Sequence, residues 1–495
     1  MKWANFLHFY QPANQKPEIL EAVTNQSYRK ILDILKNSKR GKINLNISGS
    51  LLDLFDKYGY KDLFDRTKEL VREGKIELVA SAKYHAILPL LPEEEIKRQI
   101  SENLKSLKYY LGEDIVIKGF FPPEMAWNDK LIPILESFNF SYVILDEIAY
   151  GVENKIDYRK IYKIKNSKLN VFFRERRASN LIMSAVVRDT SSFVEVMKGE
   201  VMSDRYLVTA MDGETFGHHR PGLERILEES FLDNNFELVG LSDLEKFYSE
   251  KEEVSLTEST WASSVQDIKK GIQFLTWLDP ENIIHRLQWD FLNFVLKEFY
   301  SRDSSSISDI ARNKLDIAVS SDQFFWASAK PWWSVEMIEY GAWLVIDALR
   351  SLPDLSEEGL NRARKFYEEI VSTAFDWQRS GKISTMMNNQ NSILRIPFKN
   401  RTLELGGEER GVYFAFIDMM KREELKAKNL GQYEKAIVWR DAIYKLENKL
   451  DIYDGIHAVD FFRNEVSNPE VEKTILEYKK KYKDIKGGQP EQRGQ

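Results

Sequence analysis

Cysteine is absent from the 495-residue chain, and histidine occurs only six times. The lack of cysteine excludes disulfide bonds, thiolate catalysis and metal sites with cysteine ligands. It also suits a protein from a hot environment, where thiols oxidise. Two of the six histidines, His218 and His219, stand beside each other after a run of apolar residues, in RYLVTAMDGETFGHHR (205–220). This segment is therefore a first candidate for chemistry, the alternative being an unusually polar loop.

An excess of positive charge is also missing. The chain has 71 basic and 77 acidic residues, a formal net charge of -6, which argues against nucleic acid or anionic lipid as a partner. No uninterrupted apolar run approaches about 18 residues, so a membrane-spanning helix is not expected. The N-terminal MKWANFLHFYQP lacks the apolar centre and cleavage site of a signal peptide. We expect a cytoplasmic globular protein.

Short apolar runs alternate with amphipathic segments over the first 250 residues. The runs are ANFLHF, KINLNI, KIELVAS, IVIKGFF, SYVILD, NVFFRE, YLVTAM and FELVGL. Alternation of this kind is typical of β/α units around a parallel sheet. Seven or eight strands fit a closed or nearly closed barrel better than half of a Rossmann fold. No GxGxxG motif, the fingerprint of dinucleotide-binding Rossmann folds, follows any of them.

Long amphipathic segments dominate after about residue 270. They are IIHRLQWDFLNFVLKEFYS, SVEMIEYGAWLVIDALRSL, LNRARKFYEEIVSTAFDWQRSG and QYEKAIVWRDAIYKLENKLDIY, and each predicts a helix. We expect a barrel domain over residues 1–270, a helical domain over 271–470 that completes the active-site cleft, and a flexible tail over 471–495. KNRTLELGGEERG (399–411) is predicted to be a polar interruption between helices.

Polar residues follow most of the predicted strands. In a parallel barrel the carboxyl ends of the strands converge on one rim, which carries the active site. The candidates for that rim are His8 with Gln11, Tyr84 with His85, Glu124, Asp146 with Glu147, Arg174, and Asp212 with Glu214.

Glu124 lies in GFFPPEMAWND (119–129), where two prolines end an apolar run. A carboxylate on a rigid turn in apolar surroundings suits nucleophilic attack, although a helix cap or a salt bridge would give the same pattern. Asp212 ends another apolar run and is followed by Glu214, His218 and His219. Their spacing matches neither HExxH nor an EF-hand loop, so no metal is predicted. Two carboxyls from different strands, Glu124 and Asp212, would suffice for hydrolysis of a glycosidic bond.

With these residues the chain resembles glycoside hydrolase family 57, which contains α-amylases, 4-α-glucanotransferases and α-glucan branching enzymes. The family's His-Gln-Pro motif is similar to LHFYQP, here with two residues between His8 and Gln11. The second motif is similar to GKIELVASAKYHAILPLL, the third to FPPEMAW, the fourth to the Asp-Gly-Glu of 212–214, and the fifth to SSDQFFWASAKPWW. The matched motifs span residues 1 to about 335.

This resemblance implies an α/β fold, a distorted (β/α)7 barrel with an appended α-helical domain, and a retaining mechanism without a cofactor. Glu124 would be the nucleophile and Asp212 the general acid/base. The implied substrate is an α-glucan with α-1,4 linkages, cleaved by an amylase-type hydrolase. The alternatives are a 4-α-glucanotransferase, a branching enzyme, and a carbohydrate-binding protein without activity. A metal-dependent deacetylase or mannosidase-like barrel using His8, Asp212 and His218 or His219 is a further alternative.

The remaining candidates are substrate-binding residues. The resemblance implies this role for His8, Glu77, His85 and Asp322, and Glu214 and His218 are expected to join them. Trp127, Trp261 and Trp326 would line a sugar cleft or pack in the core, and Arg174 would orient the carboxylates or form a solvated ion pair. Because Glu77 lies inside an apolar strand, it needs a partner, for which His8 and Arg174 are the candidates.

Overall fold

The computed structural model describes residues 1–185, 187–329, 332–390 and 410–448, with short stretches at 458–459, 461–463, 465–467, 470–471 and 473–478. Its contacts divide the chain into two compact units, Met1–Ile383 and Ser384–Gln495. The helices up to α17 therefore belong to the same unit as the sheet. The predicted domain boundaries at residues 270 and 470 remain predictions.

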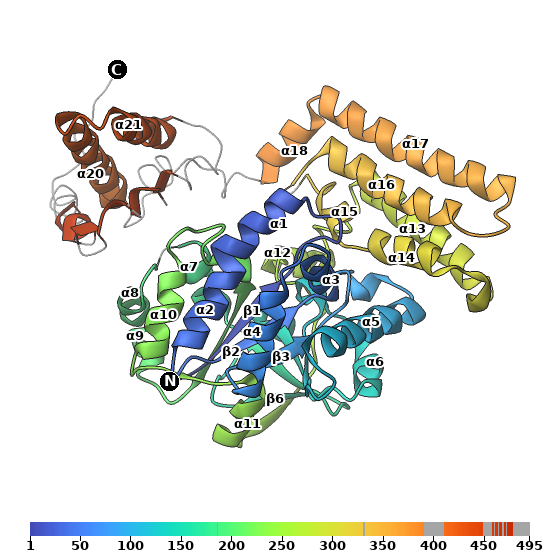
Figure 1. The fold of residues 1–495 in the computed structure, drawn as a ribbon, viewed down its shortest axis with the longest axis horizontal. Coiled ribbons are helices and arrows are strands. Elements are labelled where there is room, and N and C mark those ends of the chain that lie inside the picture. Colours follow the sequence, from blue (N-terminus) through green and yellow to red (C-terminus); the bar gives the residue numbers. More distant parts are fainter. Residues whose placement is uncertain are drawn as a thin grey trace. The chain divides into compact units, whose positions relative to one another are not determined.

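The strands of the first unit form one curled sheet (Figure 1). They are β1 (Lys2–Phe9), β2 (Ile43–Ile47), β3 (Ile76–Ala80), β4 (Gly119–Phe120), β5 (Tyr142–Asp146), β6 (Ile161–Ile164), β7 (Asn170–Arg174), β8 (Tyr206–Asp212), β9 (Glu237–Leu238) and β10 (Lys251–Val254). Their order is β10-β6-β7-β5-β4-β3-β2-β1-β8, and β9 also pairs with β1. The pairings are parallel except for β6 with β7.

The run β7-β5-β4-β3-β2-β1-β8 curls into a (β/α)7 barrel, as predicted. At its seam, the backbone N–H of Glu175 just after β7 donates to the carbonyl of Val208 in β8, at 2.8 Å. The barrel is distorted because its strands differ in length from two residues in β4 to eight in β1. Its strands are buried almost throughout, which explains why each reads as a continuous apolar run.

Helices alternate with the barrel strands along the chain. They are α1 (Pro17–Val23), α2 (Arg29–Asn37), α3 (Gly49–Lys57), α4 (Lys61–Arg72), α5 (Glu93–Leu111), α6 (Leu131–Ser137), α7 (Arg176–Met183), α8 (Thr190–Val196), α9 (Lys198–Val201), α10 (Glu224–Leu232), α11 (Leu244–Phe247) and α12 (Val265–Lys270). α4 and α5 pack against β3 (Figure 1). α7 packs against β8.

The rest of the first unit is a helical bundle. It consists of α13 (Ile283–Tyr300), α14 (Asp309–Ala318), α15 (Asp322–Phe325), α16 (Val335–Arg350) and α17 (Glu357–Arg379). Ion pairs with buried carboxylates tie α14 to α5 of the barrel: Arg98 Nη2 lies 2.6 Å from Asp316 Oδ2, and Arg312 pairs with Glu95. The bundle therefore carries the start of α15 to the barrel rim, where Ser321 Oγ lies 2.9 Å from His85 Nδ1.

The second unit has its own apolar core, which includes the buried side chains of Phe416, Trp439 and Phe462. Its helices include α20 (Arg410–Asn429) and α21 (Tyr433–Glu447), while α18 (Lys382–Gln390) begins just before the division. Residues 399–409 of the predicted polar interruption and 479–495 of the predicted tail lie outside the described residues. None of the helices that the structure describes is both long and apolar enough to cross a bilayer.

Candidate active site

The carboxyl ends of the barrel strands bring several of the predicted residues to one level. His8, the last residue but one of β1, stands directly opposite Asp212 of β8 and Asn46 of β2. On the other side of the barrel sheet, Asp146, the last residue of β5, stands opposite Arg174, the last residue of β7. The predicted rim of strand ends is thus a feature of the sheet register.

Glu124 lies on a tight turn just beyond β4. Pro123–Met125 form a single 3-10 turn, in which Glu124 has φ 60° and Met125 has φ 50°. Left-handed backbone at a residue other than glycine costs on the order of 1–3 kcal/mol and persists only where its surroundings enforce it. Two such residues in a row fix the direction of the Glu124 side chain.

The carboxylate of Glu124 has a specific donor. The indole Nε1–H of Trp261 donates to Glu124 Oε2 at 2.6 Å, and the backbone N–H of Trp261 donates to the Glu124 carbonyl at 3.0 Å. The other oxygen, Oε1, lies 3.9 Å from His85 Nδ1. One oxygen of Glu124 is therefore held by Trp261, and the other makes no direct hydrogen bond with His85.

Asp212 ends β8 and leads into a loop whose second carboxylate is buried. Glu214 accepts hydrogen bonds from Gln11 Nε2, at 3.0 Å, and from the hydroxyl of Tyr28. Tyr28 ends a π-helical turn, Thr24–Tyr28, and Ser27 of that turn donates to the Gly213 carbonyl at 2.7 Å. Turns of this type are frequent at functional sites.

Burial dominates the electrostatics of the site carboxyls, and their mutual repulsion adds to it for Glu124 and Glu214. Burial raises the pKa of Glu124 to about 8, with contributions from the charges of Asp212 and Asp322 and an opposing one from the Trp261 hydrogen bond. Burial raises the pKa of Asp212 to about 6, against the positive charge of Arg174. The pKa of Glu214 rises to about 8, first by burial and then through Asp212. Near neutral pH these three carboxyls therefore hold protons among them.

Two histidines face this group with unused ring nitrogens. His8 Nδ1 lies 2.7 Å from Asn46 Oδ1, and the rings of His8 and His85 stack at 5.0 Å. Within the described part of the chain, the Nε2 atoms of both histidines are buried without a hydrogen-bond partner. Burial lowers the pKa of His8 to about 4 and also lowers that of His85. Both rings are neutral at pH 7 and offer an Nε2 atom to a ligand.

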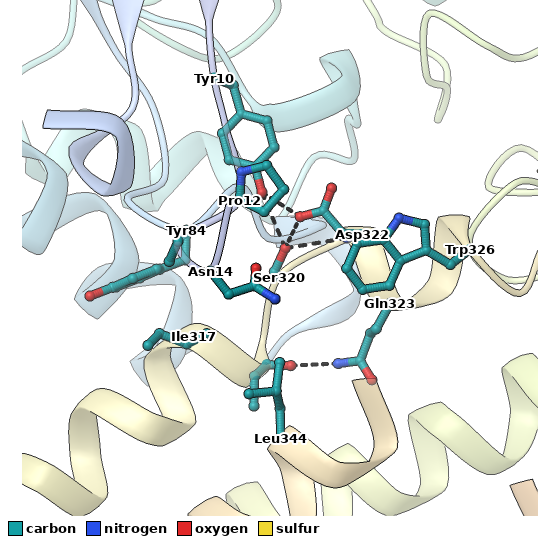
Figure 2. A pocket seen from close by; sticks show the side chains of 12 residues that line it. Tyr10, Pro12, Asn14, Tyr84, Ile317, Ser320, Asp322, Gln323, Trp326 and Leu344 are labelled. Atoms are coloured by element: carbon teal, nitrogen blue, oxygen red, sulfur yellow. Dashed lines mark hydrogen bonds between the residues drawn. The ribbon is translucent and has the colours of Figure 1, made fainter. Parts of the chain in front are cut away.

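A small pocket adjoins these histidines, between the barrel rim and the helical bundle (Figure 2). The ring of Tyr10 stacks on His85 at 4.2 Å, and its hydroxyl donates to Asp322 Oδ2. Burial raises the pKa of Asp322. Trp326 and Leu344 also line the pocket, so the wall combines polar groups with apolar faces. Sugar rings need surfaces of this mixed character.

Arg174 is buried and holds the end of β8 in place. Its Nε donates to the Ala210 carbonyl at 2.8 Å, and its Nη1 lies 2.8 Å from Asp146 Oδ2. The prediction that Arg174 orients a carboxylate is consistent with this position, because its charge acts on Asp212.

Other predicted substrate-binding residues lie apart from this group. Glu77 is the second residue of β3, away from the carboxyl end, and accepts from the Tyr142 hydroxyl at 2.6 Å and from Ser242. The expectation that His8 or Arg174 would be its partner is therefore wrong. The side chain of Trp127 is fully buried.

His218 lies on the outer side of the loop that follows Asp212. Its Nδ1 is 2.7 Å from the Gln26 side-chain carbonyl, and the neighbouring His219 is exposed. Among the described residues, no group of three or more His, Asp or Glu side chains is arranged to hold a metal ion.

Several residues of the site were not predicted from the sequence. They are Tyr10, Asn46, Tyr28 and Ser321. Asn46 left a signal, because an asparagine near the end of the apolar run INLNI must find a buried partner. Tyr28 and Ser321 left none, since both reach the site from other elements.

Sequence comparison identifies the group to which this barrel belongs. The sequence model described as "Glycosyl hydrolase family 57" matches residues 4–257, half of the chain. The chain belongs to glycosyl hydrolase family 57. The family predicted from the motifs is thereby confirmed.

Relatives within family 57 carry different activities. The chain is 27% identical to a 4-alpha-glucanotransferase of Thermococcus litoralis over 246 residues, 48% of this chain and 37% of the relative. It is 25% identical to an alpha-amylase of Pyrococcus abyssi over 314 residues, 59% of this chain and 47% of the relative. The chain thus spans less than half of the length of these curated relatives.

Solved structures of the family share the fold. The T. litoralis 4-alpha-glucanotransferase superposes with a TM-score of 0.56 at 20% identity, over 71% of this chain and 60% of the other. The branching enzyme of Pyrococcus horikoshii superposes with a TM-score of 0.54 at 17% identity, over 76% and 96%. At this level of identity the likeness shows the fold of the family 57 protein and not its specific activity.

Proposed function

We propose that this family 57 protein is a retaining glycosidase that acts on α-1,4-linked glucans, with Glu124 as nucleophile and Asp212 as general acid/base. One observation carries the assignment: Glu124 is fixed by a strained turn and by the Trp261 N–H, and it lies within electrostatic reach of Asp212. Paired carboxyls of this kind are the machinery of glycoside hydrolysis.

In the first step, Glu124 Oε1 attacks the anomeric carbon while Asp212 gives its proton to the glycosidic oxygen. The bond between the anomeric carbon and that oxygen breaks, and a glycosyl ester of Glu124 forms. In the second step, Asp212 takes a proton from water or from a sugar hydroxyl, whose oxygen displaces Glu124. Two inversions give net retention, and both carboxyls return to their initial protonation states.

The protonation states of the pair set the amount of competent enzyme. Without substrate the higher pKa lies on Glu124, whereas the first step needs Glu124 ionised and Asp212 protonated. Both arrangements carry one proton on the pair, so they occupy the same pH range. The competent arrangement is the minor one, and any donor that stabilises ionised Glu124 increases its population.

The remaining groups suit substrate binding. The free Nε2 atoms of His8 and His85 would bind sugar hydroxyls, Asp322 would accept from another hydroxyl, and Trp326 would provide an apolar face. Trp261 would act on Glu124, and Arg174 would hold the strand that carries Asp212.

The contacts of the other predicted residues favour roles away from the reacting bond. Glu77 would stabilise the end of the sheet away from the site, where it bonds to Tyr142. The buried side chain of Trp127 would stabilise the segment that follows Glu124. Glu214, which is held by Tyr28, would influence the pKa of Asp212. His218 would contact only the outer part of a long glucan.

Hydrolysis, transfer and branching share the first step and differ in the acceptor of the second. The relatives include an amylase and a glucanotransferase, and we propose amylase-type hydrolysis with transfer as the alternative.

The test is to incubate the wild type and Glu124→Gln with maltoheptaose and amylose and to resolve products by size and linkage. Glu113→Gln, an exposed position, is the matched control.

Shorter glucans from the wild type and from Glu113→Gln, but not from Glu124→Gln, are expected. Longer or branched products would replace hydrolysis by transfer or branching. Unchanged substrate in all three samples would overturn the proposed substrate class.

A further inference from the structure

Arg176, the first residue of α7, joins a buried carboxylate to the loop that carries Trp261. Its Nη2 donates to the backbone carbonyls of Trp261 and Ser263, each at 2.9 Å. Its Nε and Nη2 lie 3.2 and 3.0 Å from the two oxygens of Asp146. We propose that Arg176 is a positioning residue for the nucleophile, acting through the indole of Trp261. The inference rests on the proposed role of Glu124.

The Trp261 loop runs alongside the segment that carries Glu124. The N–H of Trp127 donates to the Ser259 carbonyl at 2.9 Å, and the N–H of Trp261 donates to the Glu124 carbonyl at 3.0 Å. These bonds fix the backbone as far as residue 261. Arg176 then holds the carbonyls of residues 261 and 263, so it secures the part of the loop from which the indole reaches Glu124 Oε2.

Asp146 provides a firm base for Arg176. Its side chain is completely buried, and it also pairs with Arg174 at 2.8 Å and accepts from the Ile148 N–H at 3.1 Å. Arg174 in turn holds the Ala210 carbonyl, two residues before Asp212. One buried carboxylate thus supports two arginines, one leading to each of the proposed catalytic carboxyls.

This arrangement affects which of the two proposed catalytic carboxyls, Glu124 or Asp212, carries the proton. The Trp261 N–H stabilises the ionised form of Glu124 and so opposes the upward pKa shift that burial causes. If Arg176 no longer holds the loop, the indole is less often in place and the pKa of Glu124 rises further. The competent arrangement then becomes rarer, tenfold for each pKa unit.

The test is the pH dependence of kcat/KM on maltoheptaose for wild type, Trp261→Phe, Arg176→Ala and Arg176→Lys. Because Glu124 has the higher pKa of the pair, its further rise moves the alkaline limb of the profile upward and lowers the maximum. We expect this joint change in Trp261→Phe and, more weakly, in Arg176→Ala. The pH profile of Arg176→Lys should lie between those of Arg176→Ala and the wild type. Lysine keeps the positive charge but cannot contact Asp146 and both carbonyls at once.

Arg177→Ala is the matched control. Arg177 follows directly in α7 but is half-exposed and pairs with Glu200, so its removal should leave the profile unchanged. Asp146 retains Arg174 in Arg176→Ala, and the variant should therefore fold. A lower maximum without a shift of the limb, or the same profile in both alanine variants, would overturn the proposal.

Hydrogen exchange separates this inference from the proposed function. Faster exchange of the backbone amides at 261–264 is expected in Arg176→Ala and not in Arg177→Ala, whether or not the wild type cleaves glucans. Equal exchange in the two variants would overturn the positioning role. A wild type that turns over no glucan, with faster exchange in Arg176→Ala alone, would overturn the proposed function and the effect on Glu124 while leaving Arg176 as the anchor of the loop.

Discussion

At the residue scale, the site is defined by two half-buried carboxyls, Glu124 and Asp212, that interact electrostatically. The pKa of Asp212 is raised to about 6 and that of Glu124 to about 8, in both cases chiefly by burial. Burial alone would favour the neutral acids, and each carboxyl that ionises makes ionisation of its neighbour harder. The structure thus contains a pair that holds one proton over a range of about two pH units.

This range predicts a bell-shaped pH profile. Below about pH 6 both carboxyls are protonated and Glu124 cannot attack, while above about pH 8 both are ionised and Asp212 has no proton to give. The measurement is kcat/KM on maltoheptaose between pH 4 and 10, in which we expect limbs near pH 6 and pH 8. A profile that is flat through either limb would contradict the pairing.

Separate roles for the two carboxyls predict different responses to leaving-group quality. Asp212→Ala should lower kcat/KM on maltoheptaose by about 10²–10⁴-fold but much less on an aryl α-maltoside, which needs little acid assistance. Because the variant lacks the negative charge that raises the pKa of Glu124, its activity should rise with pH through a limb below pH 8 and then stay level. Equal losses on both substrates would contradict the acid/base role.

Removal of the nucleophile predicts chemical rescue. Glu124→Ala should lose turnover on the aryl α-maltoside and recover it in the presence of azide, which enters from the face that Glu124 vacates. The expected product is the glycosyl azide of inverted configuration, identified by NMR. Recovery with retained configuration would show that another group attacks first.

At the scale of elements, the site depends on the docking of α14 against α5. The side chain of Glu95 is fully buried and pairs with Arg312, which also lies 3.0 Å from Asp316. Arg312→Met would leave Glu95 charged and buried without its cation, and this should reduce the free energy of unfolding by about 3–5 kcal/mol. Lys105→Met, which breaks an exposed pair with Glu102, should change it by less than about 1 kcal/mol. Denaturant titration measures both, and equal effects would contradict the role of the buried pair.

The barrel strands were predictable because their side chains are buried on both faces. KINLNI, SYVILD and NVFFRE became β2, β5 and β7, and the amphipathic segment after Pro92 became α5. IVIKGFF shortened to the two residues of β4: its first four residues lie outside the strand, and the prolines that follow it, which cannot donate to a ladder, limit the strand at its other end. β10 was not predicted: its sequence KEEV is charged, and it lies at the edge of the sheet.

Contacts between distant segments explain what the sequence did not reveal of the site. Strand ends could be read as a rim, so Glu124, Asp212 and His8 were predicted together. The hydrogen bond from Trp261 to Glu124 joins residues 137 positions apart, and the one from Tyr10 to Asp322 joins residues 312 apart. No local pattern encodes such pairs. Glu77 shows the converse, because a motif resemblance placed it in the site while the sheet places it near the start of β3.

At the scale of the whole molecule, the residues proposed for catalysis all belong to the first compact unit. The second unit has an apolar core of its own around Trp439. A chain that ends at Gln390 should therefore fold and keep kcat/KM on maltoheptaose within about threefold of the full chain. Circular dichroism and kinetics measure this, and a fragment that folds but is inactive would assign part of the site to residues 391–495.

The central claim is that Glu124 forms a covalent glycosyl ester, and trapping that ester tests it most directly. The protein is incubated with a 5-fluoro-α-glycosyl fluoride, whose good leaving group speeds formation of the ester and whose ring fluorine slows its breakdown, and is then digested and analysed by mass spectrometry. We predict a label on the peptide that contains Glu124, and no label in Glu124→Gln. A label on Asp212, Glu214 or Asp322 instead, or turnover with inversion and no label, would contradict the account.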